Sequence, residues 1–199
     1  MNLYEIETRS SLLGRLKNVE NQRSWLEFYE KYRPFLVSVA VRNRLSDAEV
    51  EEVVQETVIS LAKQLQDFEY DRSKGRFRGW LSTIVKRRVV DCRRRKKRQV
   101  KIEASLHSNV GQEEAFEESF EVLWNEEWET MLVDMARKEV IKRVSAKQYQ
   151  IYDWYVLRGR PKKNVCEMFG VTGNVVDIAK SRVGKVMQEE IEKLEDGLL

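Results

Sequence analysis

The feature that most constrains this chain is a row of apolar residues inside its most basic stretch, residues 75–99. Five apolar side chains there are spaced i, i+3, i+4, i+8 and i+11, which places them on one side of an α-helix. They are Leu81, Ile84, Val85, Val89 and Cys92. The predicted helix therefore buries one face against other elements and exposes a charged face to solvent.

Similar helical spacing recurs along the 199 residues, and no long stretch alternates as a β-strand would. The chain has only two prolines, and 35% of its residues are charged. This composition favours a helix-rich soluble protein over a β-sandwich. We therefore expect an all-α fold made of two small helical domains.

One helix is predicted over "LSDAEVEEVVQETVISLAKQL", with its start at Ser46. Glu49 lies three residues after Ser46, which is the spacing of a capping box, and acidic residues in the first turn suit the helix dipole. Its buried face should consist of Val50, Val53, Val54, Thr57, Val58, Leu61 and Leu65. Its outward face should show Glu51, Glu52, Gln55, Glu56 and Lys63.

Two further helices are expected before Ser46. A short one carries Leu12, Leu13 and Leu16, and a longer one begins at the N-cap Ser24 and is kinked or re-capped at Pro34. After the Ser46 helix, the polar "QDFEYDRSKGRFRG" predicts a loop because it contains two glycines and its aromatics lack a helical period. The basic helix is then expected to begin at Trp80.

The charges of the chain fall into two blocks, although the net charge is only +3. Residues 71–101 contain fourteen Lys or Arg and two Asp, whereas residues 102–136 contain ten Asp or Glu and no Lys or Arg. Residues 99–119 have few apolar side chains and are predicted to form a flexible acidic linker. This divides the chain into a first domain, residues 1–98, and a second helical domain, residues 120–195.

The second domain contains a helix-turn-helix pattern, "GRPKKNVCEMFGVTGNVVDIAKSRVGKVMQEE". Pro161 suits a first helical turn, Gly170 a tight turn with positive φ, and Thr172 the N-cap of the second helix. The inner sides should carry Val165, Met168, Phe169, Val175, Ile178 or Ala179, Val183 and Val186. The outer face, which a recognition helix lays into the major groove, should show Asn174, Val176, Asp177, Lys180, Ser181 and Lys185.

Cysteine and histidine usage argues against a metal or disulfide scaffold. Cys92 and Cys166 lie far apart and His107 is the only histidine, so we expect no zinc site, no disulfide framework and no cofactor. The N-terminus has early acids and no long apolar core, and no apolar run approaches the ~20 residues of a membrane span. The expectation is a cytoplasmic protein with reduced thiols and no insertion into a membrane.

Positive charge beside aromatic side chains is the combination that single-stranded nucleic acid requires, because it supplies backbone neutralisation and stacking surfaces. The stretch Arg76 to Trp80 has this composition. Trp80 is assigned to the core, and Phe77 is left open between core and base stacking. Binding through the basic helix should weaken strongly with salt.

Three stretches taken together resemble the bacterial extracytoplasmic-function sigma factors, the group-four members of the sigma family. They are "SWLEFYEKYRPFL", the block from "DAEVEEVVQET" through "GRFRGWL" to "VVDCRRR", and "VTGNVVDIAKSRVGKVMQEE". The resemblance runs from about residue 8 to 192, and its middle block is the most specific part. It implies two helical domains and a function in promoter recognition and melting by core RNA polymerase, with no catalytic residues.

The resemblance also implies three sets of site residues. The face that binds the β′ coiled coil of the polymerase would be Asp47, Glu49, Glu52, Gln55 and Glu56. Contacts to the −10 element, including a flipped single-stranded base, would come from Tyr70, Ser73, Lys74, Arg76, Phe77, Arg87, Arg88, Asp91, Arg94 and Arg95. The −35 duplex and the β flap would meet the second domain, with DNA contacts from Thr172, Asn174, Val176, Asp177, Lys180, Ser181, Arg182 and Lys185.

Asp177 departs from the pattern common in the family, because a carboxylate is awkward near phosphates, although it could accept a hydrogen bond from a cytosine amino group. The main alternative is a stand-alone helix-turn-helix regulator that binds duplex DNA without polymerase. An enzyme that uses the acids of residues 113–121 and an adaptor that only contacts polymerase are further alternatives. An anti-sigma partner is left open, as is masking of the basic helix by the acidic linker.

Overall fold

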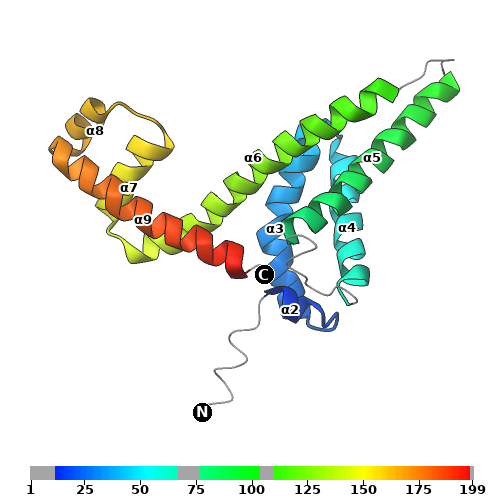
Figure 1. Ribbon diagram of the computed structural model, residues 1–199, viewed down its shortest axis with the longest axis horizontal. Helices are drawn as coiled ribbons and strands as arrows, with labels where there is room; N and C mark the ends of the chain where they lie inside the picture. The colour runs from blue at the N-terminus through cyan, green and yellow to red at the C-terminus, as the bar shows by residue number, and fades with distance from the viewer. Residues whose placement is uncertain (1–11, 67–76, 104–109, 198–199) are drawn as a thin grey trace, which may run out of the picture. The chain divides into compact units, whose positions relative to one another are not determined.

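The computed structural model describes residues 12–66, 77–103 and 110–197, and every regular element in them is helical (Figure 1). The elements are α2 (Leu12–Leu16), α3 (Gln22–Arg42), α4 (Asp47–Gln64), α5 (Phe77–Glu103), α6 (Val110–Arg143), α7 (Ala146–Tyr152), the π-helical turn η1 (Asp153–Leu157), α8 (Lys162–Phe169) and α9 (Gly173–Gly197). The expected all-α fold is confirmed. None of the described helices is long and apolar enough to cross a membrane.

The chain divides into two compact units. The first comprises Met1–Glu129 with Gly197–Leu199, and the second comprises Thr130–Asp196. The division therefore falls inside α6, at residue 130, and not at residue 120 as the charge pattern suggested. Each unit is described by itself below.

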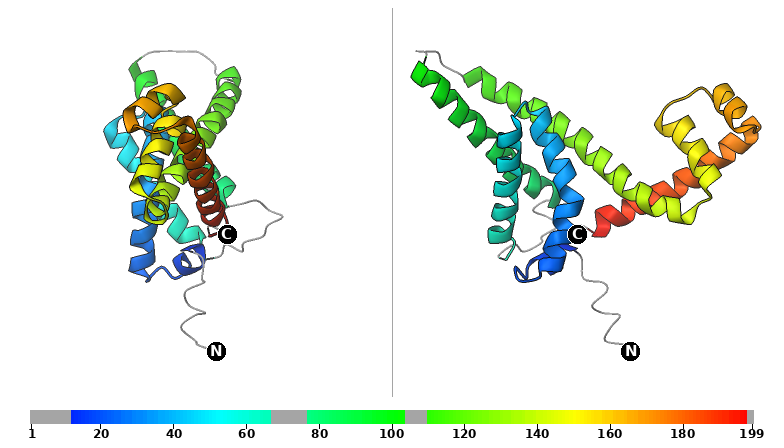
Figure 2. Two further views of the ribbon diagram at one scale, coloured as in Figure 1. Left: turned by 90° about the vertical axis from the view of Figure 1, so that its left-hand side faces the viewer. Right: turned by 180° about the vertical axis from the view of Figure 1, so that it is seen from behind.

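In the first unit, α3, α4 and α5 pack against one another around an apolar core (Figure 2). The predicted row of α5 supplies much of this core, because Leu81, Val85 and Val89 are fully buried. From α3 the largest buried side chains are Phe28 and Tyr32, whose rings stack with centroids 4.5 Å apart. The helical spacing thus identified the buried face of α5 correctly.

The start of α3 differs from the prediction. Asn21, not Ser24, is the N-cap, and its side-chain oxygen accepts the Ser24 backbone N–H at 3.2 Å. The Ser24 side chain is buried and its Oγ accepts a hydrogen bond from the Nε of Arg15 at 3.3 Å. The sequence signal for Ser24 was misleading because a serine near a helix start also serves as a buried hydrogen-bond partner. Pro34 lies within α3, which continues to Arg42.

The start of α4 confirms the predicted capping box. The Glu49 carboxylate accepts the Ser46 backbone N–H at 2.7 Å and the Ser46 hydroxyl at 2.8 Å. The predicted buried face of α4 is also found, with Val50, Val53, Val54, Thr57, Leu61 and Leu65 buried. Burial of this face leaves the acidic side of α4 toward solvent and toward α5.

The expected flexible linker, residues 99–119, is wrong where the structure describes it. Residues 99–103 extend α5 and residues 110–119 begin α6, whereas residues 104–109 lie outside the described part of the chain. Beyond this segment, Trp124 of α6 packs edge-to-face on Phe35 of α3, with centroids 4.8 Å apart. The acidic composition concealed a helix that is stabilised by aromatic contacts to residues distant in sequence.

The second unit is built from the end of α6, α7, η1, α8 and α9. Val140, Tyr152 and Val183 are buried in one core cluster, and a second cluster joins α7, α8 and α9. Gly159, just after the α7–η1 segment, has a positive φ of 61°. A left-handed φ of this kind is strained for side chains other than glycine.

Candidate nucleic-acid and polymerase interface

The exposed side of α5 has the charge expected from the sequence. Thr83, Arg87, Asp91 and Arg94 are all exposed, opposite the buried apolar row. An ion pair on this side joins Asp91 to Arg88, with Nη1 and Oδ2 3.9 Å apart. The face is thus a basic surface with one carboxylate near its centre.

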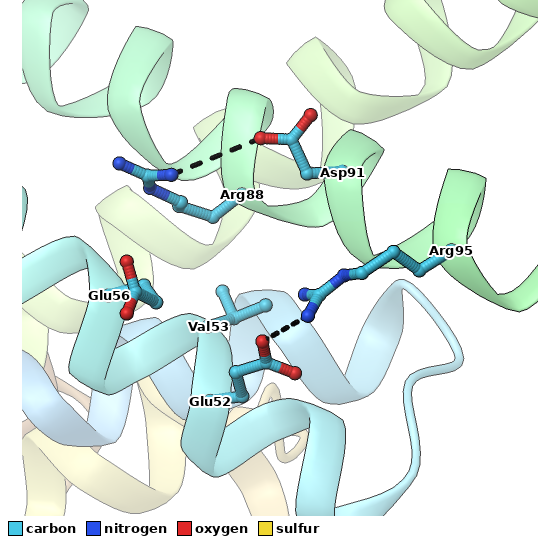
Figure 3. Close-up of a pocket in the computed structure, with 6 residues that line it drawn as sticks. All are labelled: Glu52, Val53, Glu56, Arg88, Asp91 and Arg95. Carbon is cyan, nitrogen blue, oxygen red and sulfur yellow. Dashed lines mark hydrogen bonds and ion pairs between the residues drawn. The ribbon is translucent and has the colours of Figure 1, made fainter.

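A pocket of about 340 Å³ lies between α4 and α5 (Figure 3). Its lining comes from both helices and consists of Glu52, Val53, Glu56, Arg88, Asp91 and Arg95. Glu52 Oε1 accepts a hydrogen bond from Arg95 Nη1 at 2.5 Å, across the mouth of the pocket. The structure therefore brings together residues from two sets that the sequence analysis kept apart, the polymerase-binding face and the −10 helix.

Arg88 is the most enclosed cation of this pocket, with 34% of its side chain exposed. Its Nη2 donates to Ser60 Oγ at 2.6 Å, and Ser60 Oγ in turn donates to the Glu56 carbonyl at 2.6 Å. The Nε of Arg88 is buried and has no hydrogen-bond partner in the structure. Ser60 thus holds the Arg88 guanidinium against α4, beside the Glu56 backbone.

Electrostatics fix Glu49 in its charged form. The Ser46 backbone N–H, then the Ser46 hydroxyl and Lys96, hold the pKa of the Glu49 carboxyl below its ordinary value. Lys96 Nζ lies 3.5 Å from Glu49 Oε2. Glu49 is therefore a capping residue whose charge is already balanced by α5.

The predicted polymerase-binding residues fall into two groups. Asp47 and Gln55 are exposed on α4, whereas Glu49, Glu52 and Glu56 are half-buried and turned toward α5 or its pocket. Of these five described residues, Asp47 and Gln55 are therefore the two whose side chains are exposed to solvent. The outward acidic face is thus smaller than the sequence pattern suggested.

Of the predicted base-capture residues, Tyr70, Ser73, Lys74 and Arg76 lie outside the described residues. Phe77 is described and is a core residue, only 1% exposed. Its ring packs edge-to-face on Phe28 and Tyr32, with centroids 6.4 and 6.0 Å away. Assigning Phe77 to a base-stacking surface is therefore wrong for this structure, and Trp80 beside it is half-buried.

The helix-turn-helix pattern is found as α8, a tight turn and α9. Pro161 is the N-cap of α8, and Gly170 has the left-handed conformation, φ 59° and ψ 44°, that the turn prediction required. The Thr172 carbonyl accepts the Val175 N–H at 3.0 Å at the start of α9. Six predicted contact residues of this element are exposed, namely Asn174, Asp177, Lys180, Ser181, Arg182 and Lys185, and so is Thr172.

The predicted inner and outer faces of α9 are off by one position at its start. Val176 is fully buried, so its assignment as a DNA contact is wrong, whereas Val175 and Ile178 are 39% and 52% exposed. Met168 of α8, expected inside, is 57% exposed. Near the start of α9, either of the adjacent Val175 and Val176 could belong to the buried face. The spacing i, i+3, i+7 of Val176, Ala179 and Val183 identifies Val176 as the buried one.

Asp177 has a partner that the sequence analysis did not identify. Lys162 Nζ of α8 lies 2.6 Å from each carboxylate oxygen of Asp177. This contact raises the pKa of the Lys162 ammonium group above its ordinary value, first through the hydrogen bond to Asp177. The pair neutralises the carboxylate that was awkward for a DNA-binding face.

Comparisons with known proteins give one family match. Residues 28–99 match the family Sigma-70 region 2, which spans most of α3, all of α4 and α5 up to residue 99. No curated protein matches the chain. Among solved structures, "Structure of CnrH in complex with the cytosolic domain of CnrY" is 14% identical, covers 91% of this chain and 95% of that chain, and has a TM-score of 0.36. The chain is therefore similar, over residues 28–99, to region 2 of the sigma-70 family.

Proposed function

We propose that this chain is a sigma factor of the extracytoplasmic-function group, which binds core RNA polymerase, recognises a promoter and stabilises its melted −10 element. The observation that carries this proposal is the match of residues 28–99 to Sigma-70 region 2, over the helices that form the α4–α5 pocket. In this role the protein has no catalytic group. Contacts to single-stranded DNA favour the open promoter by binding it better than the duplex.

Core polymerase is proposed to bind the exposed acidic side of α4. Asp47 and Gln55 are presented to solvent and are the strongest candidates, whereas Glu52 and Glu56 border the pocket. An acidic helix side suits a basic partner such as the β′ coiled coil, because charge complementarity raises the association rate and fixes the orientation. Glu49 contributes mainly by capping α4.

The −10 element is proposed to lie along α5. Arg87 and Arg94 are exposed there, and Arg88 and Arg95 line the α4–α5 pocket. Guanidinium groups pair with phosphate oxygens in a bidentate way, which positions a strand on the helix. Capture of a flipped base by Tyr70, Ser73, Lys74 or Arg76 remains part of the proposal.

The second unit is proposed to bind the −35 duplex through α9, and the β flap through a surface of the same unit. Exposed Lys180, Arg182 and Lys185 supply phosphate contacts, and Asn174 and Ser181 could reach base edges. Asp177 is neutralised by Lys162 and so does not repel the phosphates.

Co-elution with core RNA polymerase tests this proposal. Purified chain and core enzyme would be mixed and separated by size exclusion, beside the double variant Asp47→Ala/Gln55→Ala. The control Glu30→Ala/Gln22→Ala makes the same chemical change at exposed positions of α3. We expect co-elution of wild type and control and its loss in the α4 variant. Tight duplex binding by the chain alone, without co-elution, would support a stand-alone regulator instead.

A further inference from the structure

The first half of α6 lies alongside α5 and α3 within the first unit (Figures 1 and 2). Phe120, Trp124 and Trp128 are buried there, and Trp128 packs on Phe35 with centroids 5.5 Å apart. Arg78 at the start of α5 donates a hydrogen bond to Asn125 and lies over the Trp128 ring. An aromatic row and polar contacts therefore fix this half of α6 on the unit.

The same half of α6 presents carboxylates to the basic side of α5. A groove of about 570 Å³ lies between them. Its α5 side is lined by Gly79, Ser82, Thr83, Lys86, Arg87, Val90, Asp91 and Arg94, and its α6 side by Glu117 and Glu121. Lys86 Nζ is 2.9 Å from Glu117 Oε1. In the same region the Arg93 guanidinium lies 4.3 Å from the centroid of the Phe116 ring.

This groove overlaps the surface proposed for the −10 strand. Arg87, Asp91 and Arg94 belong both to the groove lining and to the proposed DNA contacts. A phosphate in this groove would meet Lys86, the cation that pairs with Glu117, together with the neighbouring Arg87 and Arg94. Because a carboxylate and a phosphate are both anions, they compete for one positive surface.

The competing contacts are weak enough to be exchanged. The Glu117 side chain is 63% exposed and that of Lys86 is 24% exposed, so solvent screens their attraction. The helix itself is held by the buried row Phe120, Trp124 and Trp128, which does not have to move. Rotation of the exposed Glu117 side chain therefore breaks the ion pair with Lys86 without movement of α6.

We propose that the α5–α6 groove is a binding surface for the backbone of single-stranded DNA, and that Glu117 and Glu121 are a built-in competitor that weakens its use by the free protein. The inference rests on the proposed function, since it needs α5 to meet DNA. Favourable base contacts then have to exceed the cost of displacing the glutamates, so the free protein binds strands that lack such contacts only weakly. The competition lowers the affinity for every strand by a similar factor, so strands without additional base contacts stay largely unbound, whereas a strand that makes such contacts still binds.

The test measures binding of the full chain to a short fluorescein-labelled oligothymidylate by fluorescence anisotropy over a range of salt. The groove variant Glu117→Gln/Glu121→Gln is compared with the control Glu118→Gln/Glu129→Gln. The control removes the same charge from exposed α6 positions outside the groove. Equal circular dichroism spectra and unfolding midpoints would establish that all three proteins are folded alike.

We expect the groove variant to bind roughly two- to fivefold more tightly than wild type, which is the range that loss of the exposed Lys86–Glu117 ion pair allows. Its salt dependence should steepen by about 0.7 in log–log slope for each additional phosphate contact, with no change of slope in the control. If the groove and control variants changed the affinity for the oligonucleotide equally, Glu117 and Glu121 would not be specific competitors, and the proposed function would remain in place. No binding by any of the three would overturn both the groove and the assignment of α5 to DNA.

Discussion

Arg95 of α5 and Glu52 of α4 form an ion pair with 2.5 Å between Nη1 and Oε1, which joins the proposed DNA helix to the proposed polymerase face. Their side chains are 55% and 41% exposed, so solvent screens their attraction and the pair contributes little to stability. We therefore expect Glu52→Gln to weaken co-elution with core polymerase while hardly changing the free energy of unfolding.

A matched control for this prediction is Glu51→Gln on the neighbouring position of α4. Glu51 pairs with Arg33 of α3 and is also exposed, but it does not line the α4–α5 pocket. Urea denaturation followed by tryptophan fluorescence should give similar, small effects for both variants. If Glu51→Gln weakened co-elution as much as Glu52→Gln, the effect would reflect the general charge of α4 and not the pocket.

The capping box at the start of α4 predicts a pH-dependent stability. The Ser46 backbone N–H lowers the pKa of Glu49, so this carboxylate stabilises the folded state above its unfolded pKa of about 4.3, and the contribution is lost as the pH falls through the lower folded pKa. We expect Glu49→Gln to cost less than about 1 kcal/mol at pH 7, because the amide oxygen can still accept the Ser46 N–H whereas the carboxylate charge near the helix N-terminus is lost. Urea titrations at several pH values should show this difference shrinking below about pH 4. If the difference in free energy of unfolding between wild type and Glu49→Gln stayed constant down to pH 3, the charge of Glu49 would not be the source of the stabilisation.

Local signals in the sequence predicted local structure well. The apolar row of α5, the capping box of Ser46 and Glu49, and the left-handed turn at Gly170 depend on neighbours within a few residues. Each follows from helix period, capping chemistry or backbone sterics.

Features that depend on distant partners were missed. The acidic segment before Phe120 read as a linker because the sequence does not show that Glu117 pairs with Lys86, which lies on another helix. The sequence leaves Phe77 open between core and base stacking because its partners Phe28 and Tyr32 lie far away in the sequence. Of the candidate site, the sequence therefore predicted the helices but not the pairing of Glu52 with Arg95.

Phe77 should act through stability and not through base stacking. Its ring is only 1% exposed among Phe28, Tyr32 and Trp80, so Phe77→Ala should cost about 3–5 kcal/mol of unfolding free energy. The conservative Phe77→Leu should cost less and keep the affinity for single-stranded DNA. Urea denaturation and fluorescence anisotropy measure the two effects separately. A folded Phe77→Leu protein with much weaker DNA binding would restore a role for the ring in stacking.

The pair of Lys162 and Asp177 predicts a rescue experiment. Removal of the ammonium group in Lys162→Met leaves the Asp177 carboxylate uncompensated beside the proposed −35 phosphates. Duplex affinity of the polymerase complex should fall several-fold and recover in Lys162→Met/Asp177→Asn, because the double variant is again neutral at this point. Duplex binding measured over a range of salt would show the coupling. No recovery in the double variant would mean that Lys162 itself contacts DNA.

The register of α9 separates a core valine from an exposed isoleucine two positions later. Val176 is fully buried against Ala179 and Val165, so Val176→Ala should lower the free energy of unfolding by roughly 2 kcal/mol, at about 0.8 kcal/mol for each buried carbon removed. Ile178 is 52% exposed, and Ile178→Ala should leave stability within about 0.5 kcal/mol.

Duplex binding should rank the same two variants in the opposite order from stability. An apolar side chain on the outer face of a recognition helix can contact thymine methyl groups in the major groove, so Ile178→Ala should weaken −35 binding, whereas Val176→Ala should not once the protein is folded. Measuring both variants at a temperature well below their unfolding midpoints keeps stability out of the comparison. Weaker DNA binding by Val176→Ala alone would show that α9 presents the other face to the groove.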